Sequence, residues 1–382
     1  MAKLGEVCTI VSGSTPKTSV TSYWDGNIKW ITPAELNEDT FYIMDSVRHI
    51  TEEGKEKTGL SYLPTGTVIL SSRAPIGKTA IAGCEMCCNQ GFKNLICSDA
   101  IYNEYLYFFL KSKTDYLNSL GRGATFKEIS KSIVESIEIP LPEVNQQKEI
   151  AEKFKKLEQL ISLRKQQLAK LDELVKARFV EMFGTFPANP FRWDTGKIQD
   201  VVSDVRYGSS RPAVEDGKYP YLRMNNITYS GELDLRDTKR IDIPDSELDK
   251  CTVRRGDVLF NRTNSKELVG KTCVYNRDEL MVLAGFVIRV RVNERIRSDV
   301  LSAFLNMDFS KRMLIGMCKT AIGQANINAK ELQNIDLYIP PIELQDQFVA
   351  LKNKIDQQKQ TVQQSLEKLE LLKKALMQEY FG

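Results

Sequence analysis

Two long segments decide the fold, and each carries one apolar stripe. Residues 143–184 read EVNQQKEIAEKFKKLEQLISLRKQQLAKLDELVKARFVEMFG, and residues 342–382 read IELQDQFVALKNKIDQQKQTVQQSLEKLELLKKALMQEYFG. Apolar side chains recur in both at alternating steps of four and three residues, which is the heptad pattern of helices that pack lengthwise on another helix. The first stripe consists of Ile150, Phe154, Leu157, Ile161, Leu168, Leu171 and Val175, with Arg164 in one gap. The second consists of Phe348, Leu351, Ile355, Val362, Leu369, Leu372 and Leu376, with Gln358 and Ser365 between them.

Each predicted helix begins just after prolines, which a helix tolerates only in its first turn. Pro140 and Pro142 precede the first helix, Pro340-Pro341 precedes the second, and Gln147 is matched by Gln347. Neither segment has a short loop that returns it to its own globular region. We therefore expect the two stripes to pack against each other as an antiparallel coiled coil. The alternative is that each helix packs on its own globular region.

The regions before the two helices repeat each other. Gly13-Ser14-Thr15-Pro16 is similar to Gly208-Ser209-Ser210-Arg211-Pro212, and Gly77-Lys78-Thr79 aligns with Gly270-Lys271-Thr272. Short β-branched runs such as Gly66–Leu70 predict strands, and other apolar runs predict a buried helix face. A period this long indicates a tandem duplication of a whole domain. The predicted fold is α+β and pseudo-two-fold symmetric, with globular domains at 1–142 and 185–341 and long helices at 143–184 and 342–382.

The composition restricts the class of protein. Hydrophobic residues make up 42% of the chain, enough for packed cores, and the net charge is only +3. If the protein binds nucleic acid, its positively charged side chains therefore have to be concentrated on one face. No apolar run approaches the roughly 18 residues of a membrane span, and residues 1–10 lack the pattern of a signal peptide. We interpret the eight cysteines as reduced, buried thiols of a cytoplasmic protein.

Three motifs that suggest catalysis or ligand binding are incomplete. The Gly-Lys-Thr triplets lack the first glycine of a P-loop, because Ser72 and Ser265 stand at those positions. The four cysteines between residues 84 and 97 have no counterpart in the second copy, which favours buried thiols over a zinc site. Asn189-Pro190-Phe191 lacks the second proline of an adenine methyltransferase motif, which favours a linker turn, and the chain has one histidine. We expect no catalytic centre, metal or bound cofactor in this chain.

Taken in order, the repeated motifs resemble the specificity subunits of type I restriction-modification enzymes over essentially the whole chain. In the first half they are Ser12-Gly13-Ser14-Thr15-Pro16, Tyr23-Trp24-Asp25-Gly26, Trp30-Ile31-Thr32-Pro33 and Ser71-Ser72-Arg73-Ala74-Pro75-Ile76-Gly77. In the second half they are Tyr207-Gly208-Ser209-Ser210, Leu222-Arg223-Met224-Asn225-Asn226-Ile227 and Gly256-Asp257-Val258-Leu259-Phe260-Asn261-Arg262-Thr263-Asn264-Ser265.

The resemblance implies a DNA-binding, non-catalytic subunit of a host-defence complex. Two target recognition domains would each read one half of a split site in double-stranded DNA, and the helices would act as spacers. Two adenine methyltransferase subunits, which use S-adenosylmethionine, would dock on the helices, and two restriction subunits would use ATP and Mg. The chain begins almost at the first motif, so we expect it to lack the leading segment of some relatives. The alternatives are a stand-alone DNA methyltransferase or nuclease and a coiled-coil protein scaffold.

Candidate DNA-binding residues lie in loops at matching places of the two copies. Arg, Lys, Asn and Gln read base edges, whereas Arg, Lys, Ser and Thr hold phosphates. In the first copy the candidates are Ser14, Thr15, Lys17, Thr32, Ser72, Arg73, Lys78, Arg122 and Lys127. In the second they are Tyr207, Ser209, Ser210, Arg211, Arg223, Asn225, Asn226, Asn261, Arg262, Thr263, Asn264, Lys271, Gln324 and Asn326. The alternative for each is a turn cap that faces water.

Aromatic residues that follow the predicted strands are a further possibility for base stacking. Trp30 and Tyr221 align between the copies, and the Tyr23-Trp24 pair lies nearby in the sequence. Aligned aromatic residues after a strand are more often part of a core, so we favour core positions for them.

Overall fold

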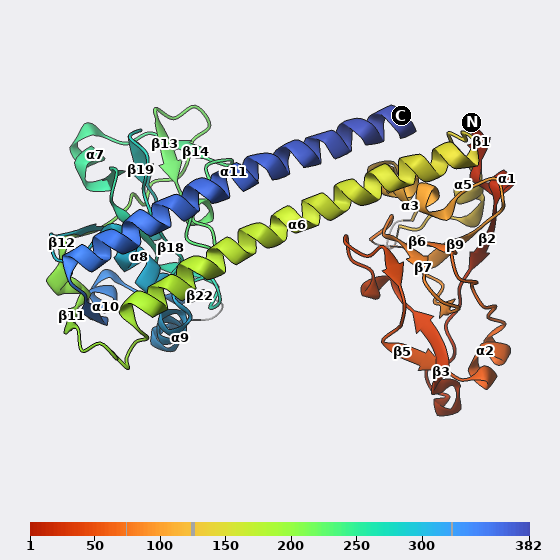
Figure 1. The fold of residues 1–382 in the computed structure, drawn as a ribbon, viewed down its shortest axis with the longest axis horizontal. Coiled ribbons are helices and arrows are strands. Elements are labelled where there is room, and N and C mark those ends of the chain that lie inside the picture. The colour runs from red at the N-terminus through yellow and green to blue at the C-terminus, as the bar shows by residue number, and fades with distance from the viewer. Residues whose placement is uncertain (74, 124–126, 322–323) are drawn as a thin grey trace. The chain divides into compact units, whose positions relative to one another are not determined.

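The chain folds into two compact units, which the computed structural model describes over residues 1–73, 75–123, 127–321 and 324–382. The first unit comprises residues 1–164 and 365–382, and the second comprises residues 165–364. Each unit thus contains a globular region and a part of both long helices, α6 (Val144–Phe183) and α11 (Ile342–Phe381), which are labelled in Figure 1. Among the described residues, no helix is both long and apolar enough to cross a membrane.

The globular region of the first unit is built on a five-stranded sheet. Its elements are β1 (Ala2–Lys3), α1 (Leu4–Val7), β2 (Cys8–Ser12), η1 (Thr21–Tyr23), β3 (Trp24–Ile31), η2 (Pro33–Glu35), β4 (Tyr42–Ile43), β5 (Arg48–Ile50), α2 (Glu52–Thr58), β6 (Val68–Ser71), β7 (Thr79–Ala82), β8 (Cys87–Cys88), β9 (Phe92–Cys97), α3 (Asn103–Ser112), α4 (Thr114–Leu120), α5 (Lys131–Ser136) and β10 (Glu138–Ile139). The main sheet has the order β2-β9-β6-β7-β4, and a smaller sheet has the order β5-β3-β8. The aromatic face of α3 packs into the core beside β6 and β7.

The second unit has the same plan. Its elements are β11 (Asp194–Lys197), η3 (Ile198–Val201), β12 (Val202–Tyr207), β13 (Tyr219–Leu222), η4 (Met224–Asn226), β14 (Lys239–Ile241), α7 (Asp245–Cys251), β15 (Thr252–Val253), β16 (Val258–Asn261), β17 (Thr263–Asn264), β18 (Thr272–Val274), β19 (Met281–Leu283), β20 (Val287–Val292), α8 (Ser298–Asn306), α9 (Asp308–Met317), β21 (Lys319–Ala321), β22 (Gln324–Asn326), α10 (Ala329–Gln333) and β23 (Asp336–Ile339). Its central strand β16 pairs antiparallel with β18 and β20, as β6 pairs with β7 and β9. The predicted duplication of an α+β domain is confirmed.

Within each unit the two long helices run antiparallel, as predicted. In the first unit, Phe154 of α6 stacks on Phe381 of α11 with ring centroids 5.6 Å apart. One turn further along α6, Glu158 accepts a hydrogen bond from Lys373, at 2.8 Å, which lies earlier in α11. The second unit shows the same direction through the pairs Phe179–Phe348, Phe183–Phe348 and Asp172–Lys359.

The seam of α11 differs from the predicted stripe. Leu372 is 48% exposed, and Gln358 is exposed as well. The residues that follow Gln358, Ser365 and Leu372 take the seam positions instead, namely Lys359, Leu366 and Lys373, and Leu366 is only 6% exposed. Both lysines form ion pairs with carboxylates of α6. A lysine can bury its alkyl stem while its ammonium group meets an acid. The predicted stripe is therefore one residue too early at these three positions, whereas its Phe348, Ile355 and Val362 are buried as predicted.

A buried glutamine ties the first long helix to its globular region. Gln147 is fully buried. Its side-chain oxygen accepts a hydrogen bond from the N–H of Tyr102 at 2.8 Å, and its amide donates to the carbonyl oxygens of Ala100 and Pro142 at 3.0 and 2.8 Å. This one side chain therefore joins the start of α6 to the loop before α3.

The second unit repeats this arrangement with Gln345. Its side-chain oxygen accepts from the N–H of Arg297 at 2.8 Å, and its amide donates to two backbone carbonyls at 3.0 and 2.8 Å. Gln347 is exposed, so its predicted match to Gln147 is wrong. The Ile-Pro dipeptides before the helices suggest an offset of 200 residues between the copies. The buried glutamines give 345 − 147 = 198, and the helix ends give the same offset.

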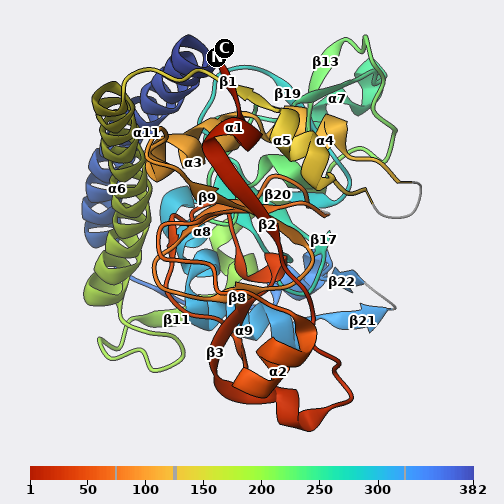
Figure 2. The same cartoon turned by 90° about the vertical axis from the view of Figure 1, so that its right-hand side faces the viewer.

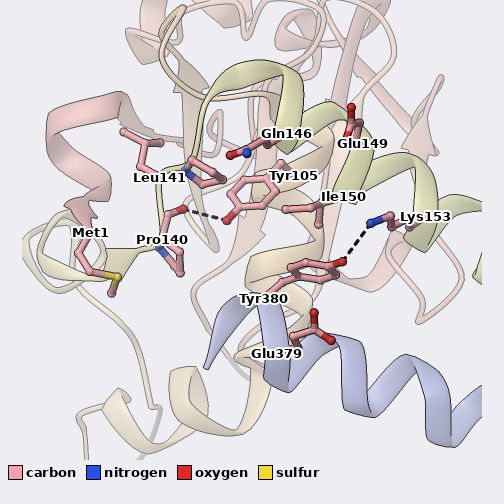
Figure 3. A pocket seen from close by; sticks show the side chains of 11 residues that line it. Met1, Tyr105, Pro140, Leu141, Gln146, Glu149, Ile150, Lys153, Glu379 and Tyr380 are labelled. Atoms are coloured by element: carbon pink, nitrogen blue, oxygen red, sulfur yellow. Dashed lines mark hydrogen bonds between the residues drawn. The ribbon is translucent and has the colours of Figure 1, made fainter.

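The first unit also contains a cavity of about 540 Å³ beside the C-terminal end of α11 (Figure 3). Met1, Tyr105 and Pro140 lie on one side of it, and Lys153 donates a hydrogen bond to the Tyr380 hydroxyl at 3.1 Å on the other. Tyr105 donates its hydroxyl proton to the carbonyl oxygen of Pro140 at 2.9 Å. No predicted DNA-binding residue lines this cavity.

Candidate nucleic-acid interface

The lysine of each Gly-Lys-Thr triplet has a structural role. Lys78 donates hydrogen bonds from Nζ to the carbonyl oxygens of Leu36 and Pro33, at 2.6 and 3.3 Å. Lys271 donates to two carbonyl oxygens at the equivalent turn of the second unit, at 2.6 and 3.1 Å. Each lysine thus clamps the 3-10 turn, η2 or η4, that follows β3 or β13. The threonine opens strand β7 or β18 rather than a helix, so neither triplet is a P-loop.

Buried aromatic side chains hold the first candidate loop of each unit. Trp30 donates its indole N–H to the carbonyl oxygen of Ser14 at 3.0 Å. Tyr221 donates its hydroxyl proton to the carbonyl oxygen of Ser209 at 3.1 Å. Trp30 and Tyr221 are only 3% and 5% exposed, which confirms their predicted core positions. The backbones hold the loops, but several loop side chains already have partners. Thr15 is hydrogen-bonded to Gln90, Ser209 is buried, and the guanidinium group of Arg211 donates to the Glu247 carboxylate at 2.7 and 3.2 Å.

Two further candidates cap the turn that the lysines clamp. The N–H and hydroxyl of Thr32 both donate to the Glu35 carboxylate, at 2.7 and 3.0 Å. In the second unit the N–H of Arg223 donates to the side-chain oxygen of Asn226 at 2.9 Å. The guanidinium group of Arg223 donates to the Asp237 carboxylate at 2.8 Å. The capping alternative therefore holds for Thr32 and Asn226, whereas the Arg223 side chain is half-buried, at 25% exposed, and ion-paired with Asp237.

Most other candidates meet at one backbone pairing in each unit. In the first unit, the segment after β6 pairs with the segment after α4 through a bridge between Arg73 and Glu128. In the second unit, β17 pairs with β22, and Thr263 lies opposite Asn326; both strands are labelled in Figure 2. We call this pairing the β-edge junction, formed by residues 72–73 with 127–129 and by residues 262–264 with 324–327.

Burial divides the predicted residues into two groups. Six are buried: Ser72, Ser209, Asn226, Asn261, Thr263 and Lys271. Those that are half-buried or exposed are Ser14, Thr15, Lys17, Thr32, Arg73, Lys78, Arg122, Lys127, Tyr207, Ser210, Arg211, Arg223, Asn225, Arg262, Asn264 and Asn326. The side chain of Gln324 lies outside the described residues. Because a buried side chain cannot touch DNA unless the fold opens, the second group supplies the remaining candidates.

The β-edge junction of the first unit concentrates positive charge. Arg73, Lys93, Arg122 and Lys127 lie in it or directly beside it, together with the carboxylate of Glu128. Glu128 accepts hydrogen bonds from Arg73 Nε at 2.9 Å and from Lys93 Nζ at 3.1 Å. Partial burial raises the pKa of Glu128, but the bonds from Lys93 and Arg73 outweigh burial and hold this pKa below its usual value. The carboxylate is therefore ionised at neutral pH, and the cluster keeps an excess of positive charge.

The β-edge junction of the second unit has a different chemistry. The guanidinium group of Arg262 lies 5.0 Å from the centroid of the Tyr207 ring, a cation–π contact. Arg262 Nε and Asn261 Oδ1 are buried and have no hydrogen-bond partner among the residues that the structure describes. A buried polar atom without a partner costs free energy. One polar atom of this junction and one of the adjoining end of β16 are thus buried and unpaired among the described residues.

The other motifs considered in the sequence have structural roles. In the turn after α6, the side chain of Asn189 makes two hydrogen bonds, of 2.8 and 2.9 Å, with the backbone of Trp193, which confirms the linker turn. Cys88 is buried in β8, where burial raises its pKa to about 12. Cys97 lies opposite Cys8 in the pairing of β2 with β9.

Comparison with known proteins identifies the family. The family model for the type I restriction modification DNA specificity domain matches residues 1–173 and 190–371. The chain belongs to this family. The type I restriction enzyme MjaIX specificity subunit of Methanocaldococcus jannaschii is 33% identical over 270 residues, which are 62% of this chain and 62% of that relative. The match thus spans less than two thirds of the relative's length.

Two solved structures support the fold of a type I specificity protein. A chain from a study of complex assembly and conformational transition of the type I R-M system has a TM-score of 0.62 and 19% identity, over 99% of this chain and 96% of that one. The type I restriction-modification system S subunit from M. genitalium has a TM-score of 0.55 and 15% identity, over 100% and 95%. At these identities the likeness shows the fold alone.

The carboxylate of the first β-edge junction was not among the residues predicted from the sequence. Glu128 lies at the place that Asn326 takes in the second unit, because both stand opposite the residue that leaves the central strand. Asn326 was predicted, so the offset of 198 residues, applied to it, points to Glu128. The sequence comparison matched the loop of Arg122 and Lys127 to that of Gln324 and Asn326 as a whole, without a residue-by-residue register.

Proposed function

We propose that the chain is the DNA specificity subunit of a type I restriction-modification complex. The observation that carries this proposal is that the family model matches both copies of the repeat, residues 1–173 and 190–371. Each copy has its own core and its own β-edge junction, so each is a complete reading domain. Residues 1–142 and 185–341 would be the two target recognition domains, each reading one half of a split site.

The long helices have two proposed tasks. Each has 40 residues, which at about 1.5 Å per residue gives a length of about 60 Å. A pair of helices of this length can set the distance between the two half-sites and offer a surface to two adenine methyltransferase subunits. The lysine–carboxylate pairs in the seam support a rigid pairing, because an ion pair shielded from water is weakened less by salt.

The chemistry of modification and cleavage is assigned to the partners. The lysines of the two Gly-Lys-Thr triplets and the turn at residues 189–191, the three segments that most resemble catalytic motifs, serve the fold of this chain. We infer that S-adenosylmethionine binds the methyltransferase subunits, and that two restriction subunits use ATP and Mg. A complex that reads cellular and incoming DNA would act in the cytoplasm.

Mapping of methylated adenines in cells tests this proposal. Cells that express the chain with its methyltransferase subunit should methylate adenine in one split motif, two short defined halves around an undefined spacer. Cells that express the methyltransferase subunit alone should not. Methylation by the isolated chain with S-adenosylmethionine would instead support a stand-alone methyltransferase. A methyltransferase complex that forms normally but has no sequence preference would support a scaffold.

A further inference from the structure

The two β-edge junctions share a backbone arrangement but carry different side-chain pairs. In the first unit the N–H of Ile129 donates to the carbonyl oxygen of residue 72 at 3.0 Å, and in the second the N–H of Ile327 donates to that of residue 262 at 2.9 Å. The residue that follows this carbonyl group, residue 73 in the first unit and residue 263 in the second, faces its partner on the opposite strand. That pair is Arg73 with Glu128 in the first unit and a threonine with an asparagine in the second.

Glu128 is held in place from several sides. Its backbone exchanges two hydrogen bonds of 3.0 Å with the backbone of Arg122. Its carboxylate accepts a bond from Lys93, whose side chain is only 8% exposed, and which also lies 3.4 Å from the Ser72 hydroxyl. The carboxylate can therefore fix the orientation of Arg73, whose side chain is 44% exposed. An arginine held in this way loses less side-chain freedom when it binds a ligand.

The carboxylate also decides which part of DNA suits Arg73. The DNA backbone carries one negative charge about every 1.7 Å of helix axis, so a phosphate placed against Arg73 would face the negative charge of Glu128 as well. A base edge carries no net charge and avoids this repulsion. Glu128 binds Arg73 through Nε, and the two terminal nitrogens form the edge of the guanidinium group that pairs with the O6 and N7 acceptors of guanine.

We propose that Arg73 reads a guanine in the half-site of the first unit and that Glu128 is its positioning residue. This proposal rests on the proposed function and adds to it a base and a pair of residues. The second unit has Thr263 and Asn326 at the equivalent places, so no arginine reads guanine from this position there. Lys17, Arg122 and Lys127 are exposed cations to which no carboxylate bond is assigned among the described side chains, and they suit phosphates better.

Binding of modified DNA by the assembled methyltransferase complex tests the proposal. The split site is first obtained from the methylated motif of the wild-type complex. Each guanine of the site is then replaced, one at a time, by 7-deazaguanine, which lacks the N7 acceptor. Wild-type affinity should fall roughly 10- to 150-fold at one guanine, the range for loss of one hydrogen bond to a charged group. The Arg73→Ala complex should bind more weakly and be indifferent to replacement of that same guanine.

Two further variants separate positioning from folding and from charge. Glu128→Gln removes the negative charge and keeps one side-chain acceptor, so it can retain the bond from Arg73 or the bond from Lys93 but not both. The two backbone bonds with Arg122 remain, so the fold should persist while the penalty at the one guanine becomes smaller. Arg73→Ala should leave the salt dependence of binding almost unchanged, whereas Lys127→Ala should reduce the slope of log K against log salt by about one. Arg255, exposed and ion-paired with Asp278 at the opposite end of a central strand, is the matched control, and Arg255→Ala should change neither property.

The outcomes distinguish the two proposals. Suppose that the wild-type complex binds a split site, but that the losses of binding free energy from Arg73→Ala and from base replacement add up at every guanine. Arg73 then does not read guanine, and the proposed function stands. If the wild-type complex has no preferred sequence, the proposed function fails and this proposal fails with it. Equal weakening of all DNA sequences by Arg73→Ala would show a phosphate contact or a structural role and overturn the proposal.

Discussion

Removal of the buried glutamine that ties each long helix to its globular region should strongly destabilise the unit that contains it. Gln147→Ala leaves the N–H of Tyr102 and the carbonyl oxygens of Ala100 and Pro142 without their partner. At about 1 kcal/mol for each hydrogen bond, and more for a buried donor left unsatisfied, the free energy of unfolding of the first unit should fall by about 3–5 kcal/mol. Gln345→Ala should have the same effect on the second unit.

Unfolding in urea, followed by the fluorine signals of fluorotryptophan-labelled protein, measures this change. Trp24 and Trp30 report on the first unit and Trp193 on the second, so the urea concentration at the midpoint of unfolding can be read for each unit separately. Gln347→Ala is the matched control, because Gln347 is exposed and its loss should stay within about 0.5 kcal/mol. The reasoning is refuted if Gln347→Ala destabilises the second unit as much as Gln345→Ala does, or if Gln147→Ala leaves the first unit unchanged.

Two other predictions concern the second unit and the seam. Leu366→Ala should destabilise the helix pair by about 2–5 kcal/mol, whereas Leu372→Ala should cost less than about 1 kcal/mol because Leu372 is 48% exposed; equal losses in urea unfolding would contradict the observed register. Burial, with Lys176 and Lys271 nearby, lowers the pKa of Lys311 from 10.5 to about 7. Between these values the unfolded chain binds more protons, so the second unit should become more stable as pH rises from 7 to 10. Lys311→Met should reduce this rise in the Trp193 midpoint, and an unchanged slope would count against the buried, neutral amine.

Much of the fold could be predicted because its signals are periodic and repeated. The heptad stripes and the prolines before them placed both long helices to within two residues at each end. The seam of α11 was partly missed, since Lys359 and Lys373 act there through carboxylate partners on α6 that lie more than 180 residues away in the sequence. No local pattern distinguishes such a lysine from a solvated one.

The candidate site was harder to predict, because polar loop residues serve the backbone as often as they face a ligand. Lys271 and Asn226 have the residue types that read DNA, but both are buried and bonded to carbonyl oxygens of their own unit. Glu128 was not among the candidates, because the two copies were compared loop by loop and not residue by residue. Only the observed bridge to Arg73 shows that this carboxylate can orient an arginine.

The most direct test of the central claim, that each unit reads its own half-site, is a comparison of methylated motifs from three complexes. One carries the wild-type chain, one carries Arg73→Ala in the first unit, and one carries Arg223→Ala with Asn225→Ala in the second. The account predicts that each variant relaxes or loses specificity in one half of the split motif, a different half for each, while the other half is unchanged. A variant of one unit that altered both halves alike would contradict it.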